Sequence, residues 1–216
     1  KINLKNISFS YKNKKIFNEL NLTINAKEKI FIYGETGCGK STLLDLILGL
    51  KRIDSGKLTI NKDDYSYKEF SMNKILGYVP QNVFLFDQTI KNNISLFKEK
   101  INENYFKNCL KITRLEKFVN SLDLSIDSLV GQNGIKISGG QKQRLGIARE
   151  VYKNPELFVF DESTSSLDEL TEKEFFEYFL NYASEKTVIF VSHNQKLKKY
   201  FNKVYRIQGG NIHEEK

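Results

Sequence analysis

Apolar and polar side chains alternate with a period of two in the first part of the chain. The apolar positions are Ile2, Leu4, Ile7, Phe9 and Tyr11, followed by Leu20, Leu22 and Ile24. Turn-like breaks at 12–15 and 26–28 separate these runs. Such alternation is typical of strands that bury one face and expose the other. The pattern therefore predicts half-buried strands at the start of the chain.

Farther along, short continuous apolar runs alternate with segments of helical spacing. Strands are expected at 30–33, 58–60, 75–79, 157–160 and 187–191, and helices at 41–50, 141–152 and 172–182. Continuous apolar strands that alternate with helices indicate a parallel sheet buried on both faces. The helix at 41–50 carries apolar residues on nearly every side, as a buried helix does.

The stretch between residues 81 and 140 has helical spacing instead. Ile90, Ile94 and Phe97 would share one helix face, and a second segment carries Phe106, Leu110, Leu115 and Phe118. These intervals are those of amphipathic helices. We therefore expect a helical subdomain at 81–140, inserted into a catalytic core formed by 1–80 and 141–216.

The composition fits one globular domain. The chain has 216 residues, of which 40% are hydrophobic and 28% charged, which excludes a disordered tail, a collagen-like repeat and a coiled-coil rod. No run approaches the roughly eighteen apolar residues of a membrane-spanning helix. Two cysteines are too few for a disulfide framework, so a cytosolic compartment is expected. The chain starts at Lys1 and its only methionine is Met72, so we expect a longer polypeptide upstream.

A glycine-rich motif lies between the strand expected at 30–33 and the helix expected at 41–50. It reads Gly34-Glu35-Thr36-Gly37-Cys38-Gly39-Lys40-Ser41 and fits the phosphate-binding loop in the context that this pattern requires. Its glycines let successive N–H groups point at phosphate oxygens, and the helix N-terminus adds partial positive charge. Lys40 would reach the outer phosphates and Ser41 would bind Mg²⁺. A glycine-rich turn without a ligand is the alternative.

Polar residues at the ends of three expected strands suggest the rest of the site. Asp161 and Glu162 follow the strand at 157–160, Gln81 follows 75–79, and His193 follows 187–191. Ligands bind at the carboxyl ends of strands in an open parallel sheet. Asp161 would be a metal ligand and Glu162 a general base. Gln81 would contact metal and water, and His193 the γ-phosphate; solvated or capping side chains are the alternatives.

A second anion site is expected where Ser138, Gly139 and Gly140 open a helix before Gln141. A serine hydroxyl and free N–H groups at a helix N-terminus favour an anion. A chain that already holds phosphates in its first loop has no evident use for a second cradle. With these motifs, the sequence resembles the nucleotide-binding domain of an ATP-binding cassette (ABC) transporter over essentially its whole length.

The resemblance implies a fold and a set of roles. The fold would be a P-loop NTPase core with a mostly parallel sheet, an N-terminal antiparallel β subdomain and an inserted helical subdomain. The bound species would be ATP and Mg²⁺, with the magnesium held through Ser41, Gln81 and Asp161. Tyr11 would stack on adenine, although a core aromatic is the alternative reading. Thr42 would complete the phosphate loop, and Lys40, Glu162 and His193 would be catalytic.

The resemblance also implies partners. Ser138, Gly139, Gly140, Gln141 and the D-loop residue Asp168 would complete the ATP site of a second copy, in an ATP-dependent homodimer with head-to-tail sites. The segment 78–94 resembles exporters, whose transmembrane domain precedes the nucleotide-binding domain in one polypeptide. That domain would dock on Gln81, Phe84, Leu85 and Phe86, an exposed apolar group for which core packing is the alternative. The chain would then lie on the cytoplasmic side of a plasma or inner membrane.

Two functions of different classes remain after these steps. The first is an ATPase motor for export or lipid flipping, with a lipid, lipid-linked oligosaccharide, peptide or drug as cargo. The second is a soluble ABC ATPase acting on nucleic acid or ribosomes, which the net charge of +8 permits. Because no run of five basic residues occurs, lysines scattered over solvated faces are the favoured explanation of that charge. We expect membrane transport and no nucleic acid partner.

Overall fold

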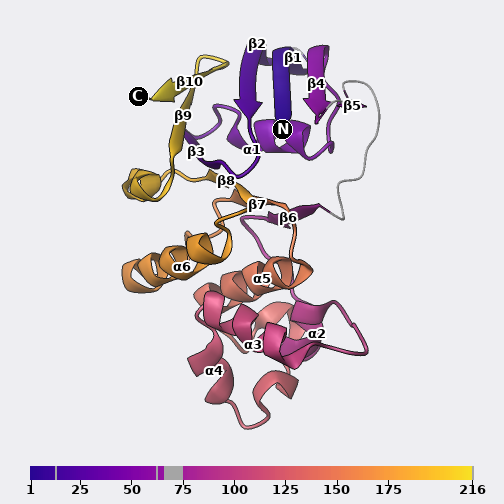
Figure 1. Ribbon diagram of the computed structural model, residues 1–216, viewed down its shortest axis with the longest axis vertical. Coiled ribbons are helices and arrows are strands. Elements are labelled where there is room, and N and C mark those ends of the chain that lie inside the picture. Colours follow the sequence, from indigo (N-terminus) through magenta and orange to yellow (C-terminus); the bar gives the residue numbers. More distant parts are fainter. Residues whose placement is uncertain (13, 62, 66–74, 216) are drawn as a thin grey trace. The chain divides into compact units, whose positions relative to one another are not determined.

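The alternating N-terminal segments form an antiparallel sheet in the computed structural model, which describes residues 1–12, 14–61, 63–65 and 75–215. Strand β1 (Ile2–Tyr11) lies between β2 (Lys14–Ile24) and β4 (Ser55–Ile60), and β5 (Asp63–Asp64) pairs with β4 (Figure 1). Leu4 pairs with Leu22 on one side and Leu58 on the other, and all three are buried. The expected half-buried strands are confirmed, because the alternating apolar residues form one shared core face.

Parallel strands follow in the same compact unit, which comprises Lys1–Leu76 and Lys186–Lys216. Strand β3 (Lys29–Gly34) pairs in parallel with β8 (Thr187–Val191) and β9 (Lys203–Gln208), and β10 (Asn211–Glu215) runs antiparallel to β9. Residues Ile30, Phe31 and Ile32 of β3 are fully buried, as a parallel strand covered on both faces requires. A short 3₁₀ helix, Gln195–Tyr200, links β8 to β9.

Helix α1 (Lys40–Ile47) follows β3 after the glycine-rich loop. Leu43, Leu44 and Leu46 are buried, in agreement with the expected buried helix. The helix ends earlier than expected, because Gly49 takes a left-handed φ of 72°. Leu50, expected inside the helix, is consequently 66% exposed.

The second compact unit, Gly77–Glu185, contains most of the helices. Strands β6 (Leu76–Val79) and β7 (Leu157–Asp161) are neighbours in its sheet. The helices are α2 (Ile90–Ser95), α3 (Glu103–Ile112), α4 (Glu116–Asn120), α5 (Gly139–Lys153) and α6 (Glu169–Tyr182), with 3₁₀ turns at Ser125–Asp127 and Gln132–Gly134. Figure 1 shows α5 beside α2 and α3 in this unit.

Phenylalanine rings form the core between β7 and α6. Phe158 and Phe160 of β7 meet Phe179 of α6 edge-to-face, with ring centroids 5.1 and 5.0 Å apart. All three rings are buried. Since aromatic pairs prefer this geometry, the cluster holds α6 against the strand that ends in the acidic pair Asp161-Glu162.

The chain is therefore an α/β fold with an antiparallel β layer and a mostly parallel sheet, as expected. The subdomain boundaries at 81 and 141 stay a prediction. One expectation is wrong: Phe97 does not share a helix face with Ile90 and Ile94. Helix α2 ends at Ser95, Leu96 and Phe97 take left-handed φ angles of 52° and 63°, and Phe97 is 50% exposed.

Candidate active site

The glycine-rich loop connects β3 to α1. At two of its glycine positions, any other residue would clash with neighbouring atoms. Gly39 has a φ of 107°, and a Cβ there would lie 2.9 Å from the Phe17 ring. A Cβ on Gly34 would lie 2.6 Å from the Ile207 carbonyl oxygen. The loop therefore takes its path only because glycine removes both the conformational strain and the steric clash.

Lys40 lies across the inside of this loop. Its Nζ donates hydrogen bonds to the carbonyl oxygens of Gly34, at 3.0 Å, and Glu35, at 3.1 Å. The side chain is only 8% exposed, so its ammonium group is held in place at the start of α1. The first turn of α1 contains no acidic residue that would oppose an anion. Backbone N–H groups, a helix N-terminus and a fixed ammonium together fit a chain of phosphates.

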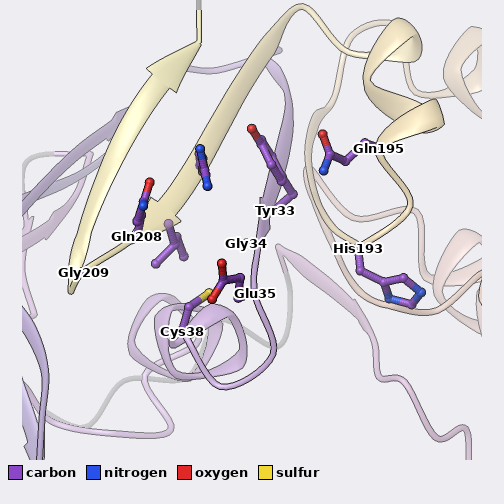
Figure 2. Close-up of a pocket in the computed structure, with 10 residues that line it drawn as sticks. Tyr33, Gly34, Glu35, Cys38, His193, Gln195, Gln208 and Gly209 are labelled. Carbon is purple, nitrogen blue, oxygen red and sulfur yellow. The ribbon is translucent and has the colours of Figure 1, made fainter.

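A cavity of about 310 Å³ lies beside the loop within the same unit. Its walls include Glu35 and Cys38 from the loop, Gln208 from the end of β9, and His193 and Gln195 from the segment after β8 (Figure 2). The fold therefore brings His193, which is far away in the sequence, to the cavity that the phosphate loop lines. Its contact with a γ-phosphate stays a prediction.

Tyr11 lies at the end of β1 and is 42% exposed. Its ring packs edge-on against Phe9, with centroids 4.9 Å apart, and the Lys51 ammonium lies 5.0 Å from its centroid. The side chain thus does not fill the core, and part of the ring remains accessible. Stacking on an adenine stays a prediction, and this exposure is compatible with it.

The second unit holds the acidic pair at the end of β7. Asp161 is 8% exposed, and Glu162 takes a left-handed φ of 49°. A non-glycine residue in that region costs about 1–3 kcal/mol, and such strain is typical of functional sites. The Gln81 amide Nε2 donates a hydrogen bond to Glu162 Oε2 at 3.2 Å. The structure therefore joins two of the residues that the sequence singled out.

The magnesium site expected from the sequence stays a prediction. The described part of the chain contains no group of three or more His, Cys, Asp or Glu residues that could hold a metal ion. Mg²⁺ usually binds one or two carboxylates together with substrate phosphates. Asp161, at the end of β7, is a carboxylate of this type, and its role as a metal ligand stays a prediction. The role of Ser41, at the exposed start of α1, likewise stays a prediction.

Ser138 and Gln141 form a reciprocal cap on helix α5. The Ser138 Oγ accepts from the Gln141 N–H at 3.2 Å, and the Gln141 Oε1 accepts from the Ser138 N–H at 2.9 Å. This arrangement fixes the entrance of the helix. The Ser138 hydroxyl still has its own proton to donate, so it can both cap the helix and bind an anion.

Asp168 also has a structural role. Its Oδ1 accepts from the Thr171 N–H at 2.9 Å and caps helix α6. Hydrogen bonds from the Thr171 side chain and backbone lower the pKa of this carboxyl group. Its expected contact with a second copy stays a prediction, as do those of Ser138, Gly139, Gly140 and Gln141.

Gln143 is a residue that the sequence interpretation missed. It is 5% exposed, and its Oε1 accepts from the Ser166 N–H at 2.9 Å. Its Nε2 lies 3.5 Å from the Gln81 carbonyl oxygen and 3.4 Å from Ser165 Oγ. Gln143 therefore links the start of the Gln81 loop to the loop that precedes α6. A glutamine on the buried face of a helix was the available signal.

The expected apolar group at 84–86 is only partly exposed. Phe84 is 60% and Phe86 38% exposed, but Leu85 is fully buried, so its expected role on an open surface is wrong. A Cβ added to Gly134 would lie 3.2 Å from Leu85 Cδ1, which shows where this side chain is packed. Exposed and buried side chains therefore alternate along 84–86.

Comparison with known proteins identifies similar sequences. The family model described as "ABC transporter" matches residues 17–165. A putative export ATP-binding/permease protein of Rickettsia typhi is 36% identical over 196 residues, covering 89% of this chain and 34% of the relative. A putative multidrug export ATP-binding/permease protein of Bacillus subtilis is 34% identical over 216 residues, covering 99% of this chain and 37% of the relative.

A solved structure is similar to this chain over nearly its whole length. It is a bacterial Atm1-family ABC exporter with ATP bound, with a TM-score of 0.91 and 30% identity, covering 99% of this chain and 38% of that one. This chain thus spans little more than a third of the proteins that it matches. Among the described residues, no helix has the length and hydropathy needed to cross a membrane.

Proposed function

The chain belongs to the ABC transporter family, and from this premise we propose that it is the motor that drives export of a substrate across a membrane. It is the ATP-binding domain of such a transporter and an ATPase. The observation that carries the proposal is its match, over 89–99% of its length, to 34–37% of the length of putative export ATP-binding/permease proteins. Because these relatives and the matching structure are exporters, transport is favoured over action on nucleic acid or ribosomes.

ATP would bind along the glycine-rich loop. Lys40 would leave its two carbonyl acceptors and donate to the outer phosphates, since a charged acceptor makes the stronger hydrogen bond. Thr36, Gly37 and Gly39 would offer backbone N–H groups, Thr42 would close the loop, and Tyr11 would stack on the base. Ser41, Asp161 and Gln81 would hold Mg²⁺, which neutralises phosphate charge when bound.

Hydrolysis would depend on Glu162. Its carboxylate would take a proton from a water as the water oxygen bonds to the γ-phosphorus and the bond to the ADP oxygen breaks. His193, at the cavity beside the loop, would hold the γ-phosphate in line. The Gln81–Glu162 hydrogen bond gives Gln81 direct influence on the position of this carboxylate. A partner that contacts Gln81 would therefore change the position of the proposed general base.

The partners would be a second copy of the chain and a permease. Ser138, Gly139, Gly140, Gln141 and Asp168 would face the ATP bound to the second copy, giving a homodimer around two ATP molecules. The permease would belong to the same polypeptide and dock on Gln81, Phe84 and Phe86. The chain would then lie at the cytoplasmic face of the membrane.

A Glu162→Gln variant tests this function. If Glu162 is the general base, turnover falls about 10²-fold or more, and light scattering shows a dimer that forms only with Mg-ATP. Glu116→Gln, which changes an exposed glutamate in the first turn of α4, is the control. Unchanged turnover in the Glu162→Gln variant would refute the assignment of the base.

A further inference from the structure

Three exposed aromatic rings form a patch on the second unit. The aromatic patch consists of Phe84, Phe86 and Phe97, with exposed fractions of 60%, 38% and 50%. The rings of Phe84 and Phe86 are 5.4 Å apart, and those of Phe86 and Phe97 are 5.3 Å apart. Residues 83–86 belong to no helix or strand. Exposed rings on such a segment need some other element to hold them in one arrangement.

Asn93 supplies the first part of that support. It lies on α2 and is fully buried. Its Nδ2 donates to the carbonyl oxygens of Phe86, at 3.0 Å, and Thr89, at 3.1 Å, while its Oδ1 accepts from the Phe86 N–H at 2.9 Å. One side-chain amide thus satisfies both backbone groups of Phe86, as a neighbouring strand would.

Arg149 supplies the second part from helix α5. Its Nε donates to the Asn93 carbonyl oxygen at 2.9 Å, and its Nη1 donates to the Phe84 carbonyl oxygen at 3.1 Å. Its Nη2 donates to Asn93 Oδ1 at 3.2 Å, and its Cζ lies 5.7 Å from the centroid of the Phe86 ring. A planar guanidinium reaches these acceptors together, which a lysine ammonium cannot do. Burial lowers the pKa of Arg149, and the nearby Glu150 opposes that shift.

We propose that Asn93 and Arg149 are positioning residues that hold the aromatic patch in its docking arrangement before the permease binds. This inference rests on the proposed function, because the occupant of the patch is the permease, whose sequence would occupy part of the roughly two thirds of the relatives' length that this chain does not cover. An arrangement that already exists does not have to be ordered on binding, so it binds more tightly. A loose patch would lose that advantage.

Asn93 and Arg149 would also transmit a displacement of the aromatic patch to the Glu162 carboxylate. The patch begins three positions after Gln81, whose amide is 3.2 Å from Glu162 Oε2. Helix α5 carries both Arg149, bonded to the Phe84 carbonyl, and Gln143, which contacts the Gln81 carbonyl oxygen. A displaced rigid segment moves Gln81 as well, whereas a flexible one absorbs the displacement.

Tryptophan fluorescence measures this order directly, because the chain has no tryptophan. Phe84→Trp places one reporter on the aromatic patch, and Leu124→Trp, at a site that is 67% exposed, places a reporter elsewhere in the same unit. Each is combined with Arg149→Lys or Asn93→Ser. Arg114→Lys is the matched control, since Arg114 binds Glu174 at 2.8 Å rather than the patch segment.

We expect the nanosecond residual anisotropy of the position-84 reporter to fall by roughly half in both variants, while that at position 124 stays unchanged. Arg114→Lys should change neither. Equal order at position 84 in all proteins would overturn the inference, and so would parallel loosening at position 124, which indicates general destabilisation. Two positioning variants are used so that the test survives if one of them fails to fold.

Photo-crosslinking in the complete membrane-embedded polypeptide then separates this inference from the proposed function. Benzoylphenylalanine replaces Phe84 in two otherwise identical proteins, one with Arg149 intact and one carrying Arg149→Lys. We expect crosslinks to the permease, reduced roughly threefold or more by Arg149→Lys. No crosslink with Arg149 intact contradicts docking on this surface, and equal yields with and without Arg149→Lys contradict the positioning role alone.

Discussion

The two cysteines should differ sharply in their reaction with a maleimide, and the structure gives the size of the difference. Cys38 lines the cavity beside the phosphate loop, whereas Cys109 is fully buried on α3. Burial raises the pKa of the Cys109 thiol from 9.0 to about 12. That change lowers its thiolate fraction about a thousandfold.

The lower thiolate fraction of Cys109 is partly offset, because a more basic thiolate is a better nucleophile. A Brønsted coefficient of about 0.4–0.5 over this interval returns roughly a factor of 20. Cys109 should therefore react roughly 50-fold more slowly than an ordinary exposed thiol, before its lack of exposure slows it further. In the native chain, one equivalent of N-ethylmaleimide should react quickly, and a second only after unfolding.

The site of the fast reaction connects this prediction to ATP. An adduct on Cys38 adds bulk to the loop that would cradle the phosphates, so alkylation should abolish ATPase activity and bound ATP should slow it. Cys38→Ser and Cys109→Ser variants assign the two phases by mass spectrometry. Fast reaction of Cys109 in the native chain would refute the burial reasoning, and a Cys38 rate that ignores ATP would refute the assignment of the loop.

Two further predictions concern stability. Ser163 is fully buried, and its Oγ has no hydrogen-bond partner in the part of the chain that the structure describes. Ser163→Ala should therefore raise the free energy of unfolding by about 1 kcal/mol in a denaturant titration. A lower free energy of unfolding in the variant would show that the hydroxyl is hydrogen-bonded. Asp168→Ala should lower it by about 1 kcal/mol through loss of the α6 cap. Because the folded pKa of Asp168 is lowered from 3.8, the carboxylate's stabilisation is present above that value and is lost as the pH falls through the folded pKa. The Asp168→Asn variant, which keeps a capping oxygen but does not titrate, should lack this component, and an identical pH dependence would contradict the assignment.

Most of the candidate site could be predicted because its residues are local in the sequence. The phosphate loop occupies 34–42, and the acidic pair directly follows the apolar strand that it terminates. Helix caps are local as well, so Ser138 could be placed at a helix start. Asp168 was not recognised as a cap, because the helix expected at 172–182 begins at Glu169. Strands β9 and β10 were not predicted, although Tyr205 and Ile207 alternate with polar residues before the glycines at 209–210. That run is short, and its pairing partner β3 lies far away in the chain.

Periodicity and short-range spacing are properties of the chain alone, and they were enough to predict most of the strands and helices and a glycine-rich loop between a strand and a helix. Long-range packing instead decided which side chains are exposed and can contact a partner. Leu85 is buried beside Gly134 while its neighbours Phe84 and Phe86 are exposed, and Asn93 and Arg149 meet around that segment from different helices. Burial and hydrogen bonding between distant segments follow from how the whole chain packs, and no local pattern contains that information.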